Sequence, residues 1–234
     1  MTLSENITKM EFAKFVNTGD KKIPAIVTIG NRSTPVWCQS EWTDGEYYKV
    51  INGSGCGHTC VAMALRLMGV EDVDPHKEYL HCREIWGAPK KTDDESTCQY
   101  GFLSVSGSAK CIRSYGVPAT AYGVEKNGRA KAVDHMLEAL KQGKVVLYDS
   151  IPTEEYPDNP FSTGAHYVLL CGITKEGKIL VANSGTKGKC DFPGIHLVDR
   201  EVLERSMIDD CYAADLTWGQ MIPVHEKAGY VIVG

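Results

Sequence analysis

The stretch GSGCGHTCVAMALRLMG, residues 53–69, sets a cysteine between two glycines immediately before an apolar segment. Apolar residues follow Cys56 on almost every side of a helical projection, which is typical of a central, buried helix. Gly69 then supplies a natural helix end. The stretch therefore predicts a buried helix with Cys56 at its N-terminus.

Cys56 has two interpretations at this point: a small packing residue at a tight turn, or a nucleophile. A helix N-terminus places partial positive charge beside the sulfur, which lowers the pKa of a thiol and favours the reactive thiolate. Gly55 and Gly57 let the backbone turn sharply and leave the sulfur accessible. Backbone N–H groups at the same helix start can hold a developing oxyanion.

The character of the chain changes from helical to extended along its length. Periodicity and end signals predict helices at residues 9–16, 56–68, 74–86, 106–115, 129–142 and 200–207. Apolar, β-branched runs predict strands at residues 144–150, 165–173, 178–184 and 230–233, with a hairpin turn at TKEGK. The segments 35–50 and 87–101 are expected to be extended or looped. This order, helices first and strands later, predicts an α+β fold.

Composition excludes several classes of function. The chain has 234 residues and a net charge of -5, which argues against the basic face of a nucleic-acid-binding protein. It has no apolar run long enough to span a membrane. Its first residues, MTLSENITKMEFAKFVNTGDKK, lack an apolar segment behind a basic start, so we expect a cytoplasmic location, or secretion if a signal precedes these residues.

The chain contains nine cysteines, an odd number that leaves at least one unpaired in the monomer. Cys60 and Cys171 lie inside apolar runs, where cysteine usually behaves as a small buried hydrophobe. We therefore expect a reducing compartment rather than a disulfide framework. No CxxC pair occurs, and Cys82 beside His81 has no partner at zinc-finger spacing, so neither a metal nor another cofactor is expected.

A cysteine nucleophile needs a base, and His166 is the best candidate because it opens an apolar strand directly after turn residues. A histidine satisfied at a strand edge is the alternative. Asn183 ends the next predicted strand, and antiparallel pairing would bring it to the imidazole, where it could set the tautomer. The other histidines are too close to Cys56, on surface helices, or without a supporting motif: His58, His76, His81, His135, His196 and His225.

Three motifs then carry a family resemblance. GSGCGHTCVAMAL resembles the nucleophile helix of the C39-like branch of papain-like cysteine peptidases, and VWCQSEW resembles the N-terminal glutamine motif of that branch. GAHYVLLCGI followed by TKEGKILVANSG resembles its histidine strand, turn and Asp/Asn strand. The motifs occur in the family order. His58 stands where the motif usually has Pro, and Asn183 stands where Asp is common.

The resemblance implies a papain-like cysteine peptidase fold, in which a nucleophile-bearing helix packs on an antiparallel sheet. It implies that Cys56 is the nucleophile, His166 the general base and Asn183 the residue that orients the base. Gln39 would donate to the oxyanion hole beside the backbone N–H of Cys56. Residues 1–36 would form an N-terminal extension and residues 37–234 the catalytic domain.

We therefore expect a bacterial thiol protease or amide hydrolase that cleaves a peptide bond through an acyl-enzyme. The alternatives are a peptidoglycan amidase or endopeptidase, a transpeptidase on the same fold, or a catalytically silent peptide-binding domain. The expected partner is a peptide or protein substrate, not a nucleic acid or a membrane. Residues 87–103 and 150–163 are polar and are expected to border the cleft and set specificity.

Overall fold

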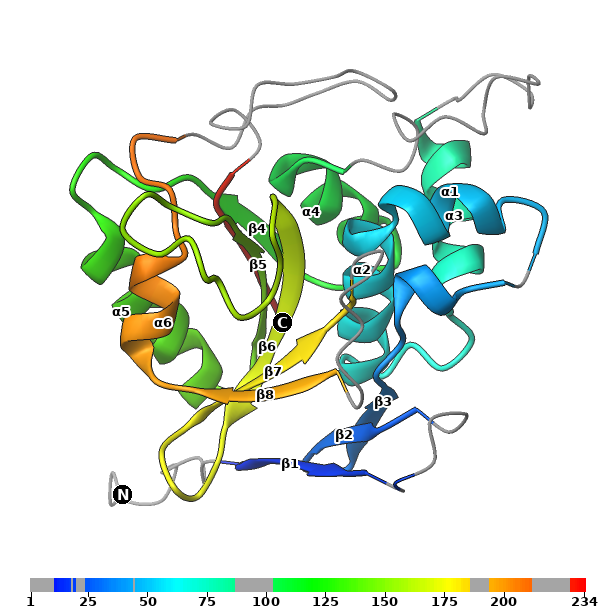
Figure 1. Ribbon diagram of the computed structural model, residues 1–234. Coiled ribbons are helices and arrows are strands. Elements are labelled where there is room, and N and C mark those ends of the chain that lie inside the picture. The colour runs from blue at the N-terminus through cyan, green and yellow to red at the C-terminus, as the bar shows by residue number, and fades with distance from the viewer. Residues whose placement is uncertain are drawn as a thin grey trace, which may run out of the picture.

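A six-stranded antiparallel sheet forms the centre of the protein (Figure 1). The computed structural model describes residues 11–17, 19, 24–43, 45–86, 103–185, 194–211 and 228–234. Across the sheet the strands are β4 (Ala119–Tyr122), β9 (Tyr230–Val233), β5 (Val145–Ser150), β6 (His166–Ile173), β7 (Ile179–Asn183) and β8 (Ile195–Val198). The last strand of the chain therefore lies between two earlier ones.

Helices cover both faces of this sheet, which explains why its central strands are apolar along their whole length. On one face lie α2 (Cys56–Leu67) and α4 (Val105–Ser114), and on the other lie α5 (Arg129–Lys141) and α6 (Arg200–Arg205) (Figure 1). A hydrophobic core lies on each face of the sheet, and successive residues of β6 point alternately into one core and the other. Tyr167 and Leu169 pack toward α2, whereas Val168 and Leu170 pack toward α5.

Helix α2 is highly enclosed: every residue from Gly57 to Leu67 is buried except Arg66. It packs on β5 and β6 and against α3 (Pro75–Ile85) and α4. The short helix α1 (Tyr48–Ser54) precedes it, and a 3-10 turn, η1 (Gln39–Glu41), precedes α1. The helix predicted to follow Cys56 is thus confirmed, and so is its central position.

A second, three-stranded antiparallel sheet is formed by β1 (Ala13–Val16), β2 (Ile26–Ile29) and β3 (Arg32–Pro35). The predicted helix at residues 9–16 is wrong over Ala13–Val16, because pairing with β2 outweighs a weak helical pattern. Gly172 lets this sheet approach β6: a Cβ there would lie 2.9 Å from the Cβ of Ala13. That residues 1–36 form a separable extension stays a prediction.

The remaining predicted helices and strands are confirmed to within a few residues, including the turn at Thr174–Gly177 that joins β6 to β7. Helices and an antiparallel sheet together confirm the α+β class. The prediction missed α1 and the short strands β2, β3, β4 and β8, whose few residues carry little periodicity. The predicted loop at residues 87–101 lies outside the described residues.

The structure contains disulfides, whereas the sequence led us to expect a reducing compartment rather than a disulfide framework. Cys82 on α3 and Cys111 on α4 form a disulfide with their Cα atoms 5.8 Å apart, and Cys38 is disulfide-bonded too. Cys56, Cys60, Cys171 and Cys211 are free. The cytoplasmic location stays a prediction. Among the helices of the described segments, none combines the length and the apolar character that crossing a bilayer requires.

The different burial of two leucines predicts that the same substitution, leucine to alanine, lowers the free energy of unfolding by different amounts at the two positions. Leu169 on β6 is fully buried in the core on the α2 side of the sheet, whereas Leu197 on β8 is 47% exposed. We expect Leu169→Ala to lower the free energy of unfolding by about 2–5 kcal/mol, because it removes buried methyl groups and leaves a cavity. Leu197→Ala should change it by no more than about 0.5 kcal/mol. Urea denaturation measures both values, and equal losses would contradict this assignment of the core.

Candidate active site

Cys56 is the first residue of α2, as predicted, and Gly55 is the N-cap. Gly55 has a negative φ of -83°, so it is needed for space rather than for a left-handed backbone. A Cβ at this position would lie 2.6 Å from the Cα and carbonyl oxygen of Ile51 on α1. A residue without a side chain is therefore what allows α1 to run directly into the start of α2 and brings Cys56 to the helix N-terminus.

The thiol of Cys56 is half-buried and lies against the beginning of β6. Burial raises the pKa of this thiol to about 11, and the carboxylate of Asp149 raises it further. Hydrogen bonds from backbone groups of Tyr167 and Gly57 act in the opposite direction. Cys56 is therefore a neutral thiol near pH 7, because desolvation outweighs the helix N-terminus that was expected to produce a thiolate.

His166 is the first residue of β6 and is 1% exposed. Its Nε2 lies 2.8 Å from Oδ1 of Asn183, the last residue of β7. Burial lowers the pKa of the imidazole to about 4, while the hydrogen bond to Asn183 acts to raise it. The ring is therefore neutral near pH 7.

Two further hydrogen bonds determine which way the amide of Asn183 faces. Its Nδ2 donates to the carbonyl oxygen of Phe161 over 3.1 Å, and its Oδ1 accepts from the N–H of Gly185 over 2.9 Å. The atom facing His166 is therefore an acceptor, so Nε2 of the neutral ring carries the proton and Nδ1 carries a lone pair. Nδ1 has no hydrogen-bond partner among the described residues. The imidazole is thus held in the tautomer that can accept a proton at Nδ1.

Gln39 is 3% exposed and lies beside the end of β7. Its backbone N–H donates to the carbonyl oxygen of Ser184 over 2.6 Å. The hydroxyl of Ser184 in turn donates to the carbonyl oxygen of Tyr167 over 2.8 Å, and the backbone of Tyr167 contacts Cys56. These contacts place the four residues predicted from the sequence near one end of the sheet. Gln39 and Cys56 contact Ser184 and Tyr167, which directly follow Asn183 and His166 in the chain. The structure places His166 against Asn183 but not in hydrogen-bond contact with Cys56.

Two residues of this region were not singled out from the sequence as site residues. His196 on β8 lies with its Nε2 3.3 Å from Nδ2 of Asn183, and its proximity lowers the pKa of His166. Asp149 on β5 is 4% exposed and pairs in register with Tyr167. No motif around His196 could have revealed it. A carboxylate inside the apolar run VVLYDS was a usable signal for Asp149, because charged residues are rarely buried without a role.

The segment 150–163 reaches this site. The carbonyl oxygen of Phe161 accepts from Asn183, and the Phe161 ring lies 5.4 Å from the ring of His196. The side chain of Asn159 donates to Ser150 over 2.7 Å and so fixes the loop to the end of β5. Its effect on specificity stays a prediction. Residues 87–102 of the other segment lie outside the described residues.

Thiol-dependent hydrolases combine a cysteine nucleophile with a base and with a residue that orients the base. This chain places Cys56 at a helix N-terminus and pairs the buried His166 with Asn183. The family model described as the Peptidase_C39 like family matches residues 35–192, which include all four residues. The chain belongs to this family, and membership indicates cysteine peptidase- or amidase-type activity. No curated protein matches the sequence.

The depressed pKa of His166 predicts a loss of stability in acid. Between about pH 6.5, the ordinary value, and about pH 4, the unfolded chain binds a proton at this imidazole that the folded chain does not bind. The free energy of unfolding should therefore fall as the pH drops through this window, by on the order of 3 kcal/mol in total. Urea denaturation across this pH window should show that the free energy of unfolding depends less on pH for His166→Gln than for the wild type. The same pH dependence in both proteins would contradict the assignment of the lowered pKa to His166.

Proposed function

We propose that the protein is a cysteine peptidase or amide hydrolase with a papain-like fold, acting on a peptide or protein substrate. Cys56 is the nucleophile, His166 the general base, Asn183 the residue that orients the base, and Gln39 an oxyanion-hole donor. The observation that carries the proposal is the tautomer of His166: Asn183 holds the proton on Nε2 and leaves Nδ1 able to accept one.

The pKa shifts of Cys56 and His166 indicate when the thiol proton moves to the imidazole. They favour transfer during the attack on the substrate over a thiolate–imidazolium pair that forms before it. The pKa of Cys56 is raised to about 11 and that of His166 is lowered to about 4, so both groups are neutral at rest. The sulfur attacks the substrate carbonyl carbon as Nδ1 of His166 accepts the thiol proton. Nδ1 of His166 makes no hydrogen bond with Sγ of Cys56 in the structure, so the side chains must move to bring these two atoms together before the proton is transferred.

In the remaining steps the leaving amine is released and the thioester is hydrolysed. The oxyanion is held by the backbone N–H of Cys56 and the side-chain amide of Gln39. The tetrahedral intermediate collapses when His166 gives its proton to the leaving amine, which leaves a thioester on Cys56. A water molecule then attacks the thioester while His166 accepts its proton. The acid product departs as His166 returns this proton to the sulfur, which restores the thiol of Cys56.

Selective alkylation tests the nucleophile and its base together. Cys56 is the half-buried thiol among the described free cysteines, while Cys60, Cys171 and Cys211 are buried, so exposure alone would favour its labelling. The informative comparison is therefore His166→Ala. If the imidazole assists the thiol, this variant should react with an electrophilic peptide probe about 10²-fold more slowly at Cys56.

Mass spectrometry of the labelled peptides measures this rate near neutral pH. Cys171→Ser is the matched control, because it removes a buried thiol elsewhere on β6 and should leave Cys56 labelling unchanged. Cys56→Ala should abolish the label and any turnover of a peptide library. Equal labelling of several cysteines, or full Cys56 reactivity in His166→Ala, would refute the proposal. Binding of library peptides without turnover would instead favour a silent binding domain.

A further inference from the structure

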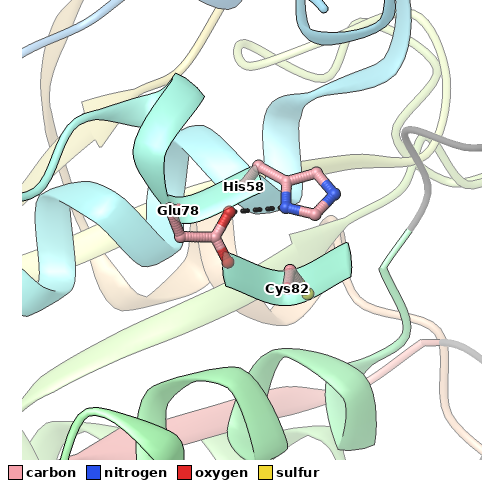
Figure 2. Close-up of side chains that lie close together, drawn as sticks. All are labelled: His58, Glu78 and Cys82. Atoms are coloured by element: carbon pink, nitrogen blue, oxygen red, sulfur yellow. Dashed lines mark hydrogen bonds and ion pairs between the residues drawn. The ribbon is translucent and has the colours of Figure 1, made fainter. Parts of the chain in front are cut away.

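A second cluster of reactive side chains lies in the core, apart from the Cys56–His166 region. It consists of His58 on α2 and of Glu78 and Cys82 on α3. All three are fully buried, and their ligand atoms (an imidazole nitrogen, a carboxylate oxygen and a sulfur) lie within 4.8 Å of one another. Figure 2 shows the imidazole and the carboxylate facing each other, with Cys82 beside them on α3.

The carboxylate of Glu78 has an environment that a cation would complete. Its Oε2 lies 2.5 Å from Nδ1 of His58, but its Oε1 has no hydrogen-bond partner among the described residues. A buried carboxylate oxygen without a partner is costly, and a bound cation is one of the arrangements that would satisfy it. The carboxylate, imidazole and sulfur together are donors for a transition metal rather than for Ca²⁺ or Mg²⁺, which prefer oxygen alone.

A fourth donor becomes available when the disulfide opens. Cys111 on α4 is bonded to Cys82, so its sulfur lies beside the cluster. Glu78 and Cys82 are four residues apart on α3 and therefore share one face of the helix. Two thiolates, one imidazole and one carboxylate from three packed helices make up four donors of the types that bind zinc, which is the number that a closed tetrahedral zinc site needs.

We propose that, when Cys82 and Cys111 are reduced, His58, Glu78, Cys82 and Cys111 bind one zinc ion. The disulfide is reduced to two thiols by one of two reductants. A thiol pair supplies two electrons and two protons and ends as a disulfide. A phosphine supplies two electrons and ends as its oxide, while a water molecule supplies the two protons and the oxygen. The two thiols then release two protons as Zn²⁺ binds the thiolates. The sulfurs need only separate to about 3.8 Å, the spacing of two thiolates on a tetrahedral zinc ion with bonds of about 2.3 Å.

Disulfide and zinc are mutually exclusive because both use the same sulfur atoms. Either one ties α3 to α4, but zinc also includes His58 and so ties both helices to the first turn of α2. His58 lies two residues after Cys56, so the metal would stabilise the first turn of α2, where the candidate nucleophile lies. The binding site itself does not depend on the proposed hydrolase activity.

Zinc content in the two redox states tests the proposal. The full chain is refolded with a phosphine reductant and with Zn²⁺, or under oxidising conditions with Zn²⁺, and unbound metal is removed. Inductively coupled plasma mass spectrometry should find about one zinc ion per chain in the reduced sample and none in the oxidised one. Zinc in the oxidised chain, or none in a reduced chain that circular dichroism shows to be folded, would overturn the proposal.

Variants identify the ligands. Cys82→Ser and Glu78→Gln should lose the zinc ion, whereas Cys171→Ser should keep it, because Cys171 is a buried free thiol on β6, outside the cluster. Zinc retained by Cys82→Ser would assign the metal to other residues and refute the site. Since a core variant can fail to fold, Co²⁺ bound to the reduced wild type gives an independent result. A thiolate-to-cobalt charge-transfer band is expected, and Co²⁺ binding without this band would refute thiolate ligation.

Discussion

The packing of α2 on β6 is the contact on which the rest of the structure depends. Buried residues along nearly the whole of α2 fill the space between the large sheet, the small sheet and α4. Because the helix is fixed against β6, its N-terminal residue Cys56 comes to the strand end that begins with His166. At the same helix start, the backbone of Ile51 on α1 leaves no room for a side chain at Gly55.

Burial also sets the chemical state of the candidate site. Desolvation raises the pKa of Cys56 and lowers that of His166, so each group is neutral before substrate arrives. A helix N-terminus contributes a fraction of a charge, which is too little to offset removal of the thiol from water. In this site the hydrogen bonds of Asn183 matter more than the helix dipole, because they select which imidazole nitrogen can accept a proton.

The local pattern of apolar and turn residues was sufficient to predict the helix and the two strands on which Cys56, His166 and Asn183 lie. The all-round apolar run predicted α2, and β6 and β7 are adjacent in sequence and joined by a short turn, so the pairing of His166 with Asn183 followed from hairpin geometry. The same reasoning could not find His196, which reaches Asn183 only because β8 pairs with β7. It also failed for Ala13–Val16, where four residues carry too little periodicity to outweigh strand pairing.

The sequence by itself determined the α+β class, the buried helix beginning at Cys56 and the histidine and asparagine strands, because each of these depends on neighbouring residues. The tertiary structure alone decided that β9 enters the sheet between β4 and β5, that Cys82 pairs with Cys111, and that His58 lies against Glu78. Periodicity shows which face of a helix is buried but not what it is buried against. Contacts between distant segments therefore had to come from the packed structure.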